Sequence, residues 1–117
     1  GQKQRAVIAR ALVLQPRFMV CDEPVSALDV SVGAQIIDLI ARIQRENKMS
    51  LLIVSHDLSL VRTLVDRVMV VQAGRIVEEG ETSELFDMPR HPYSRLLISS
   101  VPVAHPRERS PQRLAAI

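Results

Sequence analysis

Residues 18–24 read FMVCDEP, an apolar run that stops at two carboxylates and a proline. A second apolar run, LLIV at residues 51–54, stops at Ser55-His56-Asp57. Short continuous apolar runs are typical of strands in a parallel sheet, which is buried on both faces. Helical patterns lie before, between and after the two runs. The sequence therefore predicts an α/β fold in which helices flank a parallel sheet.

The helices beside these strands are predicted from the spacing of apolar residues. Residues 2–14 place Val7, Ala11 and Leu14 on one face, with Ile8 and Leu12 beside them. Pro16 ends this helix, because the residue before a proline avoids helical angles. A second helix is expected to begin with Ser31 as its N-cap and to end near Asn47. Its apolar residues recur at helical spacing: Val32, Ile36, Ile40 and Ile43.

A helix and a hairpin are predicted after the second strand. The helix covers residues 58–65. Two short strands, 68–71 and 75–79, flank Ala73-Gly74, a pair that suits a tight turn. The two glutamates of the second of these strands are expected at an exposed edge and turn.

A short helical extension and a tail are predicted to follow the hairpin. Residues 81–86 suit a short helix, and Pro92 opens another that runs through Ser99. From Val101 onward proline and arginine accumulate, which predicts a flexible tail. The expected domains are residues 1–80 for the α/β part, 81–102 for the extension and 103–117 for the tail.

Composition restricts the classes of function. The 117 residues suffice for one small domain. The aromatic residues are few and the net charge of +2 is spread along the chain, so a nucleic-acid-binding face is not expected. The single cysteine, Cys21, lies in an apolar run and is expected to be a buried, inert thiol. No apolar run approaches the length of a membrane span.

Chemically useful side chains follow both strands at their carboxyl ends, where folds of this class bind ligands. Asp22 and Glu23 follow the first strand, and His56 follows the second. One carboxylate could hold Mg²⁺ beside phosphates, its neighbour could deprotonate a water, and the histidine could hydrogen-bond a phosphate oxygen. Taken alone, an acidic pair is more often a solvated turn, and Ser-His-Asp can cap a helix. Each pattern by itself leaves both interpretations open.

Four motifs in this order resemble the nucleotide-binding subunit of ABC transporters. GQKQR at residues 1–5 resembles the end of the signature loop, and FMVCDEP resembles the Walker B strand with its following glutamate. SALD at residues 26–29 resembles the D-loop, and SHD at residues 55–57 resembles the switch-histidine segment. The resemblance extends to Pro102. It implies part of a P-loop NTPase-type parallel sheet with a C-terminal hairpin and a short helical extension.

The resemblance implies a role in ATP hydrolysis for three of these residues. Asp22 would hold the shell of a Mg²⁺ ion. Glu23 would be the general base for the attacking water. His56 would touch the γ-phosphate and report its presence.

The resemblance also implies residues that act between two ATPase subunits. Gln2 and the backbone of Gly1 would reach the γ-phosphate of ATP held by the opposite subunit, at a helix N-terminus that favours an anion. Ser26 and Asp29 would cross the dimer interface and couple the two sites.

Residues 89–97, PRHPYSRLL, resemble the C-terminal extension of dipeptide, oligopeptide, nickel and glutathione importers. His91 is interpreted as structural, because no second His or Cys lies at ligand spacing. Some members of this branch carry a cysteine cluster for an iron–sulfur centre after the His-Pro-Tyr segment. Cysteine is absent there, so no cluster is expected. The tail from Val101 is most similar to that of glutathione importers.

The sequence departs from the family pattern in its phosphate-binding part. The loop G-x-x-x-x-G-K-[ST] is absent from the 117 residues, and the signature loop lacks its leading residues. The chain begins at Gly1, and we expect it to be a C-terminal fragment of a longer subunit. We predict that it does not bind ATP well or hydrolyse it alone. We also expect incomplete cover over the strand at residues 51–54, and hence marginal folding or association.

The resemblance implies a peripheral subunit on the cytoplasmic face of the inner or plasma membrane. Its partners would be a second ATPase subunit, transmembrane permease subunits and, indirectly, a substrate-binding protein. Two alternatives remain open: an inactive docking fragment, and an ABC-superfamily ATPase that acts on nucleic acid. The extension at residues 89–97 argues against the second. The sequence decides neither the transported substrate nor whether the dimer is homomeric.

Overall fold

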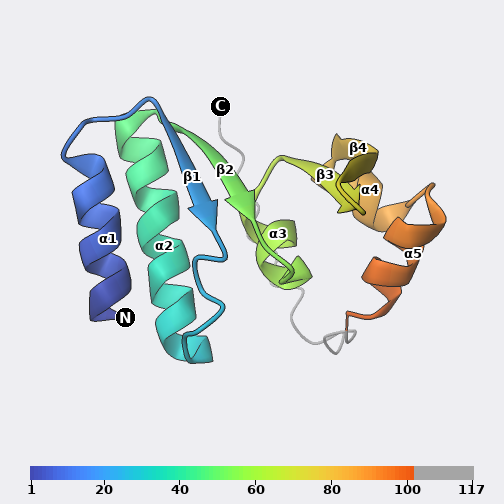
Figure 1. The fold of residues 1–117 in the computed structure, drawn as a ribbon, viewed down its shortest axis with the longest axis horizontal. Helices are drawn as coiled ribbons and strands as arrows, with labels where there is room; N and C mark the ends of the chain where they lie inside the picture. The colour runs from blue at the N-terminus through green and yellow to red at the C-terminus, as the bar shows by residue number, and fades with distance from the viewer. Residues whose placement is uncertain (102–117) are drawn as a thin grey trace, which may run out of the picture.

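A computed structural model of the chain describes residues 1–101. Its helices and strands follow one another in the order α1 (Gln2–Leu12), β1 (Phe18–Asp22), α2 (Val30–Asn47), β2 (Ser50–Val54), α3 (Leu58–Leu64), β3 (Arg67–Gln72), β4 (Arg75–Glu81), α4 (Thr82–Asp87) and α5 (Pro92–Ser99). Two groups of elements lie side by side, with α3 between them (Figure 1). The first holds α1, α2, β1 and β2, and the second holds β3, β4, α4 and α5. The predicted tail at residues 103–117 lies outside the described residues.

The strands β1 and β2 form a parallel pair, as the sequence predicted. Phe18 pairs with Ser50 at one end and Asp22 with Val54 at the other, without a register shift. Both strands therefore present their carboxyl ends at the same edge, where Glu23 and His56 follow.

Both α1 and α2 cover the same face of this sheet. Their contacts with the sheet form one core, whose buried members are Ile8, Met19, Cys21, Ile36, Ile40, Ile43 and Met49. The alternate residues of the strands point to the other face and are exposed: Phe18, Val20, Leu52 and Val54. The expected cover on both faces is thus wrong for residues 1–101, because both helices pack on one side. The expected incomplete cover over residues 51–54 is confirmed.

The helix α1 is shorter than predicted and turns a different stripe toward the core. It ends at Leu12. Ile8 is buried and Leu12 packs against the core, whereas Val7 and Leu14 are exposed. The i, i+4 pair of Ile8 and Leu12 forms one apolar stripe, and the position of the sheet selects it over the neighbouring stripe.

The N-cap of helix α2 lies two residues before the predicted one, Ser31. Asp29, in an extended conformation, is the N-cap, so Ser31 already lies in the first turn. The end at Asn47 is as predicted. Lys48 follows in the left-handed conformation (φ 51°), and its backbone N–H donates to the carbonyl oxygens of Arg45 and Gln44, a usual helix end.

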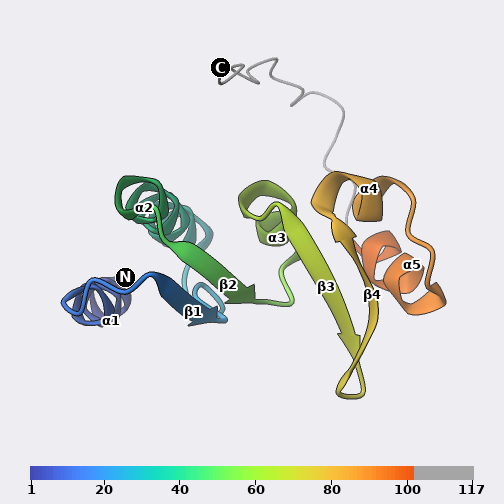
Figure 2. The same cartoon turned by 90° about the horizontal axis from the view of Figure 1, so that it is seen from above.

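The hairpin of β3 and β4 turns at the predicted pair. Ala73 and Gly74 have φ values of 49° and 75°, which is the geometry of a tight two-residue turn between antiparallel strands. The second strand continues to Glu81, beyond the predicted end at 79. The helices α4 and α5 lie beside β4, and α5 begins at Pro92 as predicted (Figure 2). No helix in residues 1–101 is long and apolar enough to cross a membrane.

Candidate functional site

The two residues predicted to be catalytic meet at the carboxyl edge of the parallel pair. The Glu23 backbone N–H donates to the Val54 carbonyl oxygen over 2.8 Å, which continues the ladder one residue past β1. Glu23 Oε1 accepts a hydrogen bond from the His56 backbone N–H at 3.2 Å and lies 2.7 Å from His56 Nδ1. The parallel register therefore joins residues that are 33 positions apart in the chain.

This pair is open to solvent. The side chain of His56 is 79% exposed and that of Glu23 is 34% exposed. A group bound from solvent could reach both side chains without any rearrangement of the fold.

The electrostatics of His56 follow from its carboxylate partner. The hydrogen bond from Glu23, and next the charge of Glu23, raise the pKa of His56 above its usual value of 6.5. Desolvation opposes this shift, and the charge of Asp57 adds to it. The protonated form of His56 donates a charge-assisted hydrogen bond to Glu23. Glu23 therefore favours the protonated form of His56.

Asp57, next to His56, is occupied as a helix cap. Its carboxylate accepts from the backbone N–H groups of Ser59 and Leu60 at 3.0 and 3.2 Å, which starts α3. The hydrogen bond from the Ser59 hydroxyl is the main reason why the pKa of Asp57 is lowered. Asp57 therefore fixes the start of α3, directly after His56.

Glu23 has a backbone conformation that L-residues rarely adopt. Its φ is 46°, in the left-handed region, and the buried Pro24 follows. Such conformations cost of order 1–3 kcal/mol and cluster at functional sites. Here the left-handed turn directly follows β1, at the point where the Glu23 carboxylate meets His56.

The two residues predicted for the subunit interface lie on the loop between β1 and α2. The Ser26 hydroxyl donates to the Glu23 carbonyl oxygen at 3.2 Å, so a hydrogen bond joins this loop to Glu23. Asp29 is exposed, and its side chain makes no cap hydrogen bond with α2. The structure thus brings Ser26, but not Asp29, into contact with Glu23.

Gly1 and Gln2 lie at the start of α1 and are exposed. A Cβ atom built on Gly1 would lie only 2.8 Å from Val32 Cγ1, so a larger residue at this position would require a shift of Val32 or of the start of α1. Among residues 1–101 no hydrogen bond joins Gly1 or Gln2 to Glu23 or His56. They form a separate surface in one copy of the chain.

Asp22 suits a Mg²⁺ ion that is shared with phosphates. It is exposed at the last position of β1. In the described part of the chain, no group of three or more His, Cys, Asp or Glu residues is arranged to hold a metal. A single carboxylate fits Mg²⁺ because this ion keeps several waters and takes other ligands from substrate phosphates.

The sequence did not predict the contact that Glu78 makes with the segment before α5. Glu78 was expected at an exposed strand edge, yet its carboxylate accepts hydrogen bonds from the backbone N–H groups of Arg90 and His91. No local pattern around Glu78 indicates this contact with a segment 12 residues later. His91 has the structural role that was expected, because its Nδ1 accepts the backbone N–H of Tyr93 at the start of α5.

Comparison with known families matches the C-terminal part of the chain. Residues 77–116 fit the family model described as "Oligopeptide/dipeptide transporter, C-terminal region". This range contains the PRHPYSRLL segment and confirms the branch that the sequence predicted.

Comparison with curated proteins finds relatives over most of the chain. The chain is 53% identical over 106 residues to the oligopeptide transport ATP-binding protein OppF of Streptococcus pyogenes serotype M1. This match covers 91% of this chain and 34% of that protein. The OppF protein of Escherichia coli K12 is 50% identical over 91% of this chain and 32% of its own length. The glutathione import ATP-binding protein GsiA of Pectobacterium atrosepticum is 47% identical over the whole chain and 19% of its own length. The chain thus spans about a third or less of these relatives.

Solved structures with the same arrangement are ATP-binding cassettes. The dimeric post-hydrolysis state of the cassette MJ0796, bound to ADP and Pi, matches with a TM-score of 0.62 and 31% identity over 69% of this chain and 34% of that one. The cbiO1 protein of Clostridium perfringens, part of the ABC transporter complex cbiONQ, matches with a TM-score of 0.68 and 33% identity over 74% of this chain and 35% of that one. With the sequence matches, these structures show that the chain belongs to the ABC ATP-binding proteins; the relatives that it matches are named for oligopeptide transport and glutathione import.

Proposed function

We propose that the protein containing this chain hydrolyses ATP to drive the import of an oligopeptide, a dipeptide or glutathione. The observation that carries the proposal is the 2.7 Å contact between Glu23 and His56 at the carboxyl edge of the parallel pair. The relatives named as oligopeptide and glutathione import proteins support the substrate class.

In the proposed reaction, Glu23 accepts a proton from the water that attacks the γ-phosphate of ATP. The new bond joins the water oxygen to phosphorus, and the bond from phosphorus to the leaving ADP oxygen breaks. His56 holds the Glu23 carboxylate in position through its Nδ1 atom. The rest of the His56 ring is exposed and would contact a phosphate oxygen. Asp22 would hold Mg²⁺, which when bound neutralises charge on the phosphates.

The remaining site residues are proposed to act across a dimer of ATPase subunits. Gly1 and Gln2 would reach ATP on the opposite subunit, and Ser26 and Asp29 would lie at the interface. Their exposed positions support this role, as does the hydrogen bond that ties Ser26 to Glu23. The 117 residues contain no phosphate-binding loop, so we propose that the chain alone does not turn over ATP.

The proposed partners are a second ATPase subunit, transmembrane permease subunits and, indirectly, a substrate-binding protein, with no nucleic acid. The proposed location is the cytoplasmic face of the membrane. The cbiO1 relative, part of an ABC transporter complex, supports this view. We also propose the division into residues 1–80, 81–102 and 103–117.

A second candidate is a docking fragment without activity. The exposed apolar face of the parallel pair favours it, because such a face invites a covering partner.

Hydrolysis of Mg-ATP distinguishes the two candidates. The chain would be compared with a longer polypeptide that joins it to the phosphate-loop part of an OppF relative. We expect hydrolysis by the longer polypeptide only. Absence of hydrolysis in both, with partner subunits present, would favour the docking fragment. Turnover by the chain alone would contradict its proposed inactivity.

A further inference from the structure

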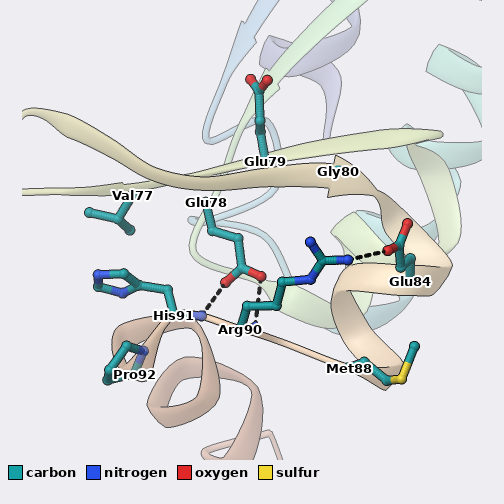
Figure 3. A pocket seen from close by; sticks show the side chains of 9 residues that line it. All are labelled: Val77, Glu78, Glu79, Gly80, Glu84, Met88, Arg90, His91 and Pro92. Carbon is teal, nitrogen blue, oxygen red and sulfur yellow. Dashed lines mark hydrogen bonds and ion pairs between the residues drawn. The ribbon is translucent and has the colours of Figure 1, made fainter.

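The segment that leads into α5 is held by one carboxylate on β4. Glu78 Oε1 accepts the backbone N–H of Arg90 at 2.8 Å, and Glu78 Oε2 accepts the backbone N–H of His91 at 2.9 Å (Figure 3). Both carboxylate oxygens are thus used on two successive amides. Hydrogen bonds to an ionised acceptor are roughly twice as strong as neutral ones.

These bonds complete the hydrogen bonding at the start of α5. The first N–H groups of a helix and of its cap have no partner within the helix. Glu78 satisfies those of Arg90 and His91, Pro92 has none, and His91 Nδ1 accepts that of Tyr93 at 3.1 Å. Every backbone donor from Arg90 to Tyr93 is therefore accounted for, and two of the three depend on Glu78.

The contact between β4 and this segment is partly open. A hollow of about 540 Å³ lies between β4 and the segment, lined by residues that include Val77, Met88 and His91. In the described residues, Arg90 makes one other polar contact, an ion pair between its Nη2 and Glu84 Oε1 at 2.9 Å, and both of these side chains are exposed. Exposed ion pairs contribute about 0–1 kcal/mol. The Glu78 carboxylate is a direct polar link between the hairpin and this segment, made to two backbone amides.

The surroundings of Glu78 keep it ionised. The Ser94 hydroxyl, and next the Arg90 amide, lower the pKa of Glu78 to about 2, against the opposing effect of desolvation. The Ser94 hydroxyl is fully buried but has no hydrogen-bond partner in the described residues, so the contacts seen to stabilise the ionised Glu78 are those of the two backbone amides. The His91 amide and ring also lower this pKa.

We propose that Glu78 is the positioning residue that docks the C-terminal extension on the hairpin, through the backbone of Arg90 and His91. The extension then functions as one unit with β4. The family match supports this unit, since it begins at residue 77, directly before Glu78. The proposal does not depend on ATP hydrolysis.

Amide hydrogen exchange in the full chain tests the proposal. Glu78→Gln should accelerate exchange at Arg90 and His91 at least tenfold, while the amides of the buried part of α2 keep their rates. Glu79→Gln is the matched control, because Glu79 points away from the segment on the other face of β4 (Figure 3), and it should leave both amides unchanged. Glu78→Asp keeps the charge on a shorter side chain and should restore part of the protection.

A second readout is cleavage by trypsin after Arg90, which should follow the same order among the variants. Unchanged exchange and cleavage in Glu78→Gln would overturn the proposal. Equal acceleration in Glu79→Gln would also overturn it. If Glu78→Gln unfolds the chain, Glu78→Asp takes its place. Faster exchange at Arg90 and His91 than in the wild type, with unchanged rates in α2, then supports the proposal, and wild-type exchange at both amides overturns it.

Discussion

The same substitution should have opposite effects on stability at two glycines. Gly33 lies in α2, and a Cβ atom there would meet Val25 Cβ at 3.5 Å, an ordinary van der Waals contact. Gly33→Ala should therefore stabilise the chain by up to about 1 kcal/mol, the helix-propensity difference between glycine and alanine. Gly74 has a φ of 75° and no atom within 4 Å of a built Cβ. Gly74→Ala should destabilise by about 1–2 kcal/mol, purely through its backbone conformation.

Thermal or urea unfolding measures both variants against the wild type. A change of 1 kcal/mol shifts the Tm of a domain of this size by roughly 4–8 °C, so the two variants should lie on either side of the wild type and be clearly separated. The reasoning is refuted if Gly33→Ala lowers the Tm, since Val25 would then be closer than the structure places it. It is also refuted if Gly74→Ala leaves the Tm unchanged.

Three other substitutions test the site and the core. NMR titration of the His56 ring should give a pKa above 6.5, because the hydrogen bond and charge of Glu23 raise it, and Glu23→Gln should return it toward 6.5. Because the pKa of His56 is raised, the stabilisation from its contact with Glu23 is fully present below pH 6.5 and is lost as pH rises through the folded-state pKa. The same His56 pKa in the wild type and in Glu23→Gln would show that the contact is absent in solution. Ile40→Ala, at a residue that is 0% exposed, should cost about 2–5 kcal/mol in urea unfolding. Ile76→Ala, at a residue that is 57% exposed, should cost less than about 1 kcal/mol, and equal losses would contradict the described core.

The part of the site that could be predicted from sequence depends on local patterns. Glu23 and His56 each follow a short apolar run, and parallel strands in register bring such residues to one edge. The turn at Ala73-Gly74 and the helix start at Pro92 were also predictable, because glycine permits the positive φ of such a turn and proline fixes the φ of a first helical residue.

The features that were missed depend on contacts between distant segments. Periodicity in α1 allows two overlapping apolar stripes, and only the position of the sheet selects Ile8 over Val7. Asp29 and Ser31 are both good N-caps, and the chain path decides between them. Glu78 binds amides on a segment whose position depends on the whole hairpin.

The central claim, that Glu23 is the general base of an ATPase, is tested most directly by one substitution in the longer polypeptide that carries a phosphate loop. Glu23→Gln should lower kcat about 10²–10⁴-fold, the usual contribution of a general base, and leave ATP binding intact. Glu46→Gln, at an exposed carboxylate on α2, is the matched control and should keep the wild-type rate. A Glu23→Gln protein that binds and hydrolyses ATP at the wild-type rate would contradict the account.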